Sequence, residues 1–244
     1  MTICTRNLGP PLRLLLALVF ALQAGCAHGE GLRAVSQHDF AFASATYQYS
    51  VFTPTAFRDS AQLPVLLLLH GAGGKGEDML NLWRDFAEQK GILLVAPTFP
   101  LDAKFETQVP RLFPQFMNKV RVDYHFDPRR VYVFGYSAGG YITFDAATLC
   151  SDYFAAAGVF ADVISPDYDW IVTKAKRKTP IAIYIGDSDP AFTFAQTRRT
   201  RDLLESRGFP VHYVEIPHQN HNYGAASATV NPDVWNFMSR YTLP

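Results

Sequence analysis

The stretch Val131-Tyr-Val-Phe-Gly-Tyr-Ser137-Ala-Gly-Gly140 decides how this 244-residue sequence folds. Its first five residues are mostly apolar, which is typical of a strand buried on both faces of a sheet. After the serine, apolar residues recur at spacings of three and four, as on one face of a helix: Ala138, Ile142, Ala146 and Leu149. The stretch therefore predicts a strand, a sharp turn with a serine at its apex, and a helix.

The segment Gly135-Tyr-Ser137-Ala-Gly139 fits the Gly-x-Ser-x-Gly pattern of a nucleophile elbow. The serine of such an elbow has a strained backbone, and glycines are needed on either side because a β-carbon there would collide with neighbouring backbone. The hydroxyl is then exposed above the sheet. We take Ser137 as the candidate nucleophile; the alternative is a glycine-rich turn that merely contains a serine.

The composition is that of an ordinary globular chain able to bury one sizeable core. Hydrophobic residues make up 48% of the sequence, and 22 Lys and Arg balance 22 Asp and Glu, so the formal net charge is zero. This balance argues against a nucleic-acid partner. Zinc-ligand spacing and a phosphate-binding Gly-Lys-Ser/Thr loop are missing from the sequence, so we expect neither a metal nor a cofactor.

The amino terminus has the pattern of an export signal. Two arginines precede the apolar run Leu14–Leu22, which is too short to span a bilayer. We expect residues 1–27 to be a signal peptide and the mature protein, without a membrane span, to be secreted or periplasmic. Because Ala24-Gly25-Cys26 resembles the end of a lipobox, a lipoprotein lipidated at Cys26 is an alternative, and an uncleaved anchor is another. Cleavage after residue 27 leaves Cys150 as the one cysteine, expected to be a buried, inert thiol.

From about residue 35 to residue 244 we expect a single domain in which strands and helices alternate. Strands are predicted at Tyr47–Phe52, Val65–Leu69, Ile92–Ala96, Val131–Phe134, Ala156–Phe160, Ile181–Ile185 and Val211–Ile216, and helices at about 77–90, 111–123, 138–150, 193–207 and 232–241. Continuous apolar strands separated by helices predict a mostly parallel central sheet with helices on both faces. Ligand sites in such sheets lie beyond the carboxyl ends of the strands, so the residues that follow strands are the candidates for chemistry.

A glycine-rich loop, His70-Gly-Ala72-Gly-Gly74, follows one of the early strands. Small residues allow backbone N–H groups to face a substrate oxygen, as an oxyanion hole requires. We expect the N–H groups of Ala72 and Ala138 to form it, with Gly73 as the alternative to Ala72. His70 is expected to brace the loop. A loop whose glycines serve only to turn the chain is the alternative.

Two late strands end in carboxylates and histidines. Asp187 and Asp189 follow one of them, and His218 and His221 follow the last. A carboxylate that accepts a hydrogen bond from a histidine fixes its tautomer and stabilises the imidazolium formed when a serine loses its proton. We expect Asp189 to be the acid and His221 the base, with Asp187 and His218 as alternatives. The histidine pair could instead bind zinc, but no third ligand is grouped with it.

The chain order serine, aspartate, histidine, each after its own strand, is that of the α/β-hydrolase fold. Residues 45–241 resemble the secreted carboxylesterases grouped with polyhydroxybutyrate depolymerases and feruloyl esterases. Besides this chain order, the resemblance rests on four segments: His70–Gly74, Asn81–Gly91, Leu93–Pro97 and Asp127–Gly140. The resemblance implies a serine carboxylesterase that forms an acyl-enzyme, needs no cofactor and acts on small-molecule or polymer-end esters. The chain departs from many depolymerases at Ala72, where they carry a cysteine, and from many relatives at Asn220, where they carry a glycine.

Other functions remain open from the sequence. A secreted peptidase or an acyltransferase could use the same residues, and a chain of this fold could bind a ligand without catalysis. The interval from Phe160 to Thr179 is short, which predicts no large lid over the site. An open site favours short or bulky esters over long acyl chains.

Overall fold

The computed structural model describes residues 34–58, 62–101 and 103–244, all of which lie in one compact unit, Gly31–Pro244. The expected signal peptide at residues 1–27 and the alternative lipidation site Cys26 lie outside the described residues.

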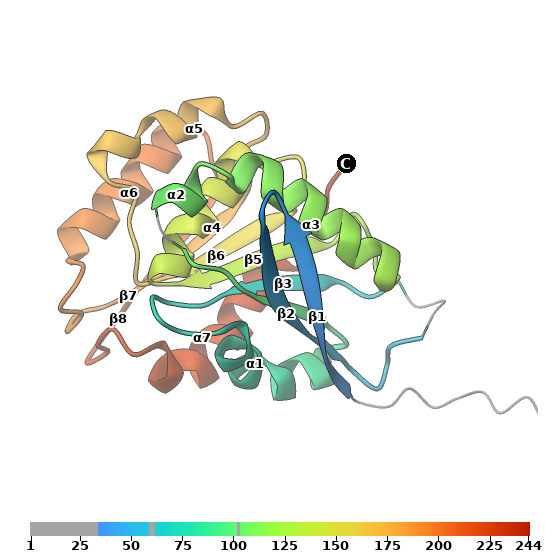
Figure 1. Ribbon diagram of the computed structural model, residues 1–244. Helices are drawn as coiled ribbons and strands as arrows, with labels where there is room; N and C mark the ends of the chain where they lie inside the picture. Colours follow the sequence, from blue (N-terminus) through green and yellow to red (C-terminus); the bar gives the residue numbers. More distant parts are fainter. Residues whose placement is uncertain (1–33, 59–61, 102) are drawn as a thin grey trace, which may run out of the picture. The chain divides into compact units, whose positions relative to one another are not determined.

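The central element is an eight-stranded sheet with the strand order β1-β2-β4-β3-β5-β6-β7-β8 (Figure 1). The strands are β1 Ala34–Phe42, β2 Ala45–Thr53, β3 Val65–Leu69, β4 Leu93–Thr98, β5 Val131–Tyr136, β6 Ala156–Phe160, β7 Ile181–Gly186 and β8 Val211–Ile216. β2 runs antiparallel to both β1 and β4, and the pairs from β4 to β8 are parallel. The expected mostly parallel sheet is confirmed.

Helices cover both faces of this sheet (Figure 1). They are α1 Gly76–Lys90, α2 Ala103–Glu106, α3 Val109–Asp123, α4 Ala138–Leu149, α5 Trp170–Lys174, α6 Phe194–Ser206 and α7 Tyr223–Met238, with a 3₁₀ helix at Pro166–Tyr168. Because successive side chains of a strand point to opposite faces, Leu67 and Leu69 of β3 join one core cluster with α3, α4 and α6, whereas Leu66 and Leu68 join the other with α1 and α7.

Several elements differ from the sequence-based expectation. The short helices α2 and α5 and the 3₁₀ helix were not predicted. The last helix begins at Tyr223, not at Pro232, which lies inside it; a helix tolerates a proline when its surroundings hold it in place. The additional strand β1 pairs with β2 along its whole length. β1 lacks the continuous apolar run by which the other strands were predicted, because it is an edge strand with exposed positions at Val35, Gln37 and Asp39.

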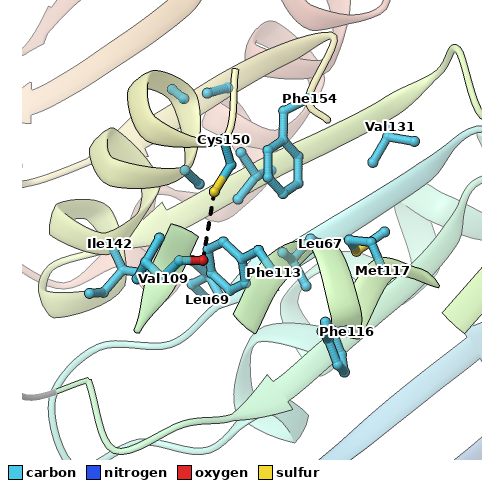
Figure 2. Close-up of a cluster of buried hydrophobic side chains, with 14 of the residues drawn as sticks. Leu67, Leu69, Val109, Phe113, Phe116, Met117, Val131, Ile142, Cys150 and Phe154 are labelled. Atoms are coloured by element: carbon cyan, nitrogen blue, oxygen red, sulfur yellow. Dashed lines mark hydrogen bonds between the residues drawn. The ribbon is translucent and has the colours of Figure 1, made fainter. Parts of the chain in front are cut away.

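The larger core cluster fills the space between the sheet and the helices α3 and α4 (Figure 2). Cys150 lies in it with 3% of its surface exposed, and its Sγ is 3.6 Å from the carbonyl oxygen of Val109. Burial raises the pKa of this thiol to about 12. The expected burial of Cys150 is confirmed, and at neutral pH the thiol stays protonated.

Candidate active site

Ser137 occupies a sharp turn between β5 and α4, with φ 53° and ψ −125°. The turn closes only because glycines flank it: a β-carbon on Gly135 would lie 2.1 Å from the carbonyl oxygen of Gly139, and one on Gly139 would lie 2.4 Å from that of Leu69. A positive φ at a serine costs conformational energy that the surrounding structure must offset. The backbone N–H of Ser137 donates to the carbonyl of Phe160 at 3.0 Å, which ties the turn to the neighbouring strand β6.

Three side chains that are far apart in the sequence form a continuous hydrogen-bonded series. His221 Nδ1 lies 2.8 Å from Asp189 Oδ2, and His221 Nε2 lies 2.9 Å from Ser137 Oγ. Because an ionised carboxylate can only accept, Nδ1 carries the proton that is donated to Asp189. Nε2 of the neutral imidazole is then free to accept the hydroxyl proton of Ser137, which is the arrangement that a general base requires.

Asp189 is held more firmly than Asp187. The Asp189 side chain is 0% exposed, and its second oxygen, Oδ1, accepts the backbone N–H groups of Ala191 at 2.8 Å and Phe192 at 3.0 Å. Asp187 is exposed, and the backbone N–H of His218 and the hydroxyl of Ser188 lower its pKa. The structure thus brings Asp189 to His221 and leaves Asp187 as a carboxylate that stabilises its own turn.

The two histidines of the last loop have different surroundings. His218 is exposed and has φ 57°, whereas His221 is half-buried between two aromatic rings, with the Tyr136 centroid at 5.4 Å and the Phe192 centroid at 6.0 Å. Both ring nitrogens of His221 are already engaged. Within the part of the chain that the structure describes, no group of three His, Cys, Asp or Glu side chains could hold a metal ion.

The glycine-rich loop after β3 lies against the serine. A β-carbon on Gly71 would be 3.5 Å from Ser137 Cβ, and the loop turns through a hydrogen bond from Gly74 N–H to the Gly71 carbonyl at 3.0 Å. Ala72 is exposed at the tip of this turn, and Gly73 has φ 72°. Ala138 is the first residue of α4, where backbone N–H groups have no partner within the helix. His70 is buried, and its Nδ1 donates to the Gly71 carbonyl at 2.7 Å.

Asp162 is a buried carboxylate next to the elbow that the sequence analysis did not single out. It is 5% exposed, and a β-carbon on Gly140 would lie 2.9 Å from its Cβ. Burial raises its pKa to about 7, while the backbone N–H groups of Val163 and Tyr141 act in the opposite direction. Asp162 directly follows the end of β6, so the rule that points to residues after strands could have found it.

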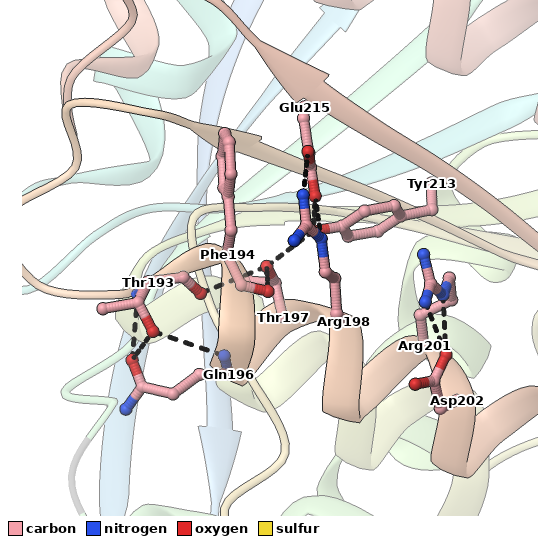
Figure 3. Close-up of polar contacts among 9 residues, drawn as sticks. All are labelled: Thr193, Phe194, Gln196, Thr197, Arg198, Arg201, Asp202, Tyr213 and Glu215. Carbon is pink, nitrogen blue, oxygen red and sulfur yellow. Dashed lines mark hydrogen bonds and ion pairs between the residues drawn. The ribbon is translucent and has the colours of Figure 1, made fainter.

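Helix α6 makes polar contacts close to the loops that carry Asp189 and His221, and Figure 3 shows these contacts. Thr193 and Gln196 form a capping box at its amino terminus, only four residues after Asp189. Further along the helix, Arg198 binds both carboxylate oxygens of Glu215 at 2.6 and 2.7 Å, which connects α6 to β8. A bidentate pair of this kind gives orientation as well as attraction. It holds the end of β8 that leads to His221.

The sequence from residue 87 to residue 234 matches the model of the dienelactone hydrolase family. The chain belongs to the dienelactone hydrolase family. Among curated relatives of this family member, a bifunctional acetylxylan esterase/xylanase from Neocallimastix patriciarum is 23% identical over 218 residues, covering 74% of this chain and 31% of the relative. The chain thus spans less than a third of that protein. An acyl-protein thioesterase 1 from Gibberella zeae is 22% identical over 213 residues, covering 69% of this chain and 88% of the relative.

Solved structures show the same fold at low sequence identity. A ferulic acid esterase from Anaeromyces mucronatus has a TM-score of 0.67 and 17% identity, covering 86% of this chain and 91% of its own. A poly(3-hydroxybutyrate) depolymerase from Bordetella parapertussis has a TM-score of 0.67 and 18% identity, with coverages of 84% and 91%. The expected α/β-hydrolase fold and the resemblance to these two groups are confirmed.

The search for membrane-spanning segments gave no candidate: none of the helices within residues 34–244 that the structure describes combines the length and the apolar character that a bilayer crossing needs.

Proposed function

We propose that this member of a hydrolase family is a carboxylesterase that acts through Ser137, His221 and Asp189. The observation that carries the proposal is the unbroken series of hydrogen bonds from Asp189 through His221 to Ser137 Oγ, at 2.8 and 2.9 Å. Nucleophile, base and orienting acid are thereby within reach of one another. Relatives described as esterases support the choice of esters as substrates.

The reaction begins when Ser137 Oγ attacks the ester carbonyl and its proton moves to His221 Nε2. Asp189 stabilises the imidazolium that forms. The carbonyl oxygen becomes an oxyanion, which accepts hydrogen bonds from the backbone N–H groups of Ala72 and Ala138. The intermediate then collapses, and the alcohol leaves with the proton from His221. Water, deprotonated by the same histidine, releases the acid from the acyl-enzyme and restores Ser137.

The proposal extends to where the protein works. The apolar run Leu14–Leu22 within residues 1–27 supports export, so we infer a secreted or periplasmic enzyme acting on small-molecule or polymer-end esters. Mass spectrometry of the protein recovered from its producing cells tests this. A mature amino terminus near residue 28 in the medium or periplasm agrees with it, a lipid on Cys26 favours the lipoprotein, and an intact leader in the cytoplasm contradicts export.

Labelling by a fluorophosphonate probe tests the catalytic proposal. The wild-type protein should be labelled and should hydrolyse p-nitrophenyl acetate, and Ser137→Ala should lose both properties while keeping its thermal melting transition. Folded wild-type protein that takes no label would contradict the triad and favour a binding protein that has lost catalysis. A matching peptide anilide and an alcohol acceptor, added in parallel, distinguish an esterase from a peptidase and from an acyltransferase.

A further inference from the structure

Two pockets lie beside the elbow, and they differ in volume and in how open they are. The first has a volume of about 230 Å³ and lies between the glycine-rich loop, α1 and the start of α7, where Ala72, Leu82 and Gly224 line it. The second, of about 350 Å³, is more open and is lined by Pro190, Asn220 and His221. Tyr136 and Asn222 line both, so the two pockets meet beside the elbow.

The smaller pocket begins next to the nucleophile, at Gly71. This glycine lines the pocket, and its β-carbon position is 3.5 Å from Ser137 Cβ. The inner wall is apolar, because Met79 and Tyr223 are buried core residues that also line it. Leu82 and Gly224 are neighbours on the pocket wall, since a β-carbon on Gly224 would be in van der Waals contact with Leu82 Cδ2 at 3.9 Å. The size of the side chains at these two positions therefore changes the space in the pocket.

The chemistry of the proposed esterase distributes the two halves of an ester between these pockets. The leaving alcohol takes its proton from His221, so it must lie on the side of that histidine. The pocket that His221 lines is the open one. The oxyanion faces the N–H groups of Ala72 and Ala138, and the remaining substituent of the carbonyl carbon is the acyl group. The smaller pocket beside Ala72 is left for it.

We propose, on the basis of the esterase function above, that the smaller pocket binds the acyl group and the open pocket the alcohol, so that the substrate is a short- or medium-chain acyl ester of a bulky alcohol. A volume of about 230 Å³ holds about seven or eight water-sized groups, so the pocket accommodates acyl chains of up to about eight carbons. The apolar wall suits an alkyl chain, while the open pocket sets little limit on the alcohol.

Substrate series that vary one half of the ester at a time test the assignment. With p-nitrophenyl butyrate, octanoate and dodecanoate, kcat/KM of the wild type should fall by about tenfold or more from octanoate to dodecanoate, because the pocket must exclude the extra methylenes. With phenyl and 1-naphthyl acetate, kcat/KM should differ by less than about threefold, since bulk on the alcohol meets an open pocket.

Two substitutions change the smaller pocket in opposite directions. Leu82→Ala enlarges it and should raise the ratio of dodecanoate to octanoate turnover by about tenfold, whereas Gly224→Leu fills part of it and should lower the ratio of octanoate to butyrate turnover by about tenfold. Neither should change the ratio of naphthyl to phenyl acetate. Leu203→Ala is the matched control, because Leu203 is also partly buried but lies on α6 and lines neither pocket.

The outcomes separate this inference from the proposed function. Wild type that takes the fluorophosphonate label but hydrolyses dodecanoate as well as octanoate overturns the inference alone. A folded, labelled Leu82→Ala variant also overturns it if the ratio of naphthyl to phenyl acetate turnover changes and the ratios between acyl chain lengths do not. The two halves of the ester would then occupy the opposite pockets. Absence of labelling in the wild type contradicts the esterase itself. Circular dichroism melting of each variant ensures that the ratios come from folded protein.

Discussion

At the scale of single residues, the two aspartates after β7 offer the sharpest comparison. Asp189→Asn removes the carboxylate that holds the tautomer of His221, and kcat should fall by about 10⁴-fold. Asp187→Asn, two positions away, changes an exposed turn carboxylate and should alter kcat by less than about threefold. Steady-state kinetics with p-nitrophenyl acetate measure both. Equal losses in the two variants would mean that the acid has been assigned to the wrong residue.

Much of the candidate site could be predicted at this scale, because each candidate residue lies in the loop or turn that follows a strand. Ser137, Asp189 and His221 were chosen by that rule, and the structure brings them into hydrogen-bonding contact. The same rule would have included Asp162. Its burial could not be predicted, since it depends on the close approach of Gly140 on the elbow helix, which no local pattern encodes.

At the scale of elements, the prediction was most reliable where a strand is buried on both faces. β3 and β5 are continuous apolar runs and were found with accurate starts. β1 was missed because half of its side chains are exposed at the sheet edge, and the start of α7 was missed because Tyr223 and the small residues after it pack against α1. Such packing joins segments distant in the sequence, and it also creates the smaller pocket between α1 and α7.

The junction of β5 and α4 leads to a prediction on stability. Gly135→Ala places a β-carbon 2.1 Å from a backbone oxygen of α4, and it should lower the free energy of unfolding by about 3 kcal/mol or more. Gly224→Ala is the matched control in the first turn of α7, where the nearest atom is a side-chain oxygen at 3.2 Å. The higher helix propensity of alanine should offset that contact and keep the change in the free energy of unfolding within about 1 kcal/mol.

Urea denaturation of the two variants, followed by circular dichroism, makes the measurement. If Gly135→Ala melts like the wild type, the elbow does not depend on the glycine that the structure shows between β5 and α4.

At the scale of the whole molecule, a buried carboxylate on α4 makes stability depend on pH. Asp145 is 0% exposed, and burial followed by the charge of Glu106 raises its pKa from 3.8 to about 8. Between these values the folded protein keeps a proton that the unfolded chain has released. The contribution of protonated Asp145 to the free energy of unfolding is therefore complete below pH 3.8. It falls by about 1.4 kcal/mol per pH unit as the pH rises toward 8.

Asp145→Asn removes this titration, so the loss of melting temperature between pH 5 and pH 8 should become smaller. Asp162, with its pKa raised to about 7, acts in the same direction, and part of the dependence should remain. Asp39→Asn on the exposed face of β1 is the control and should keep the full wild-type dependence. Melting curves at several pH values decide the matter, and an Asp145→Asn variant with an unchanged pH dependence would show that this carboxyl is already ionised in the folded state.

The antiparallel course of β2 has a consequence for immobilisation. Ala34 pairs with Thr53, and β2 runs opposite to β4, so the first described residue lies beside the amino ends of the parallel strands, at the end of the sheet opposite to Ser137. Leu243 is hydrogen-bonded to Arg129, just before the start of β5, so the carboxyl terminus lies at the same end of the sheet. A bead, a membrane or a fused carbohydrate-binding module attached at either end would leave the mouth of the open pocket facing outward, toward an insoluble substrate.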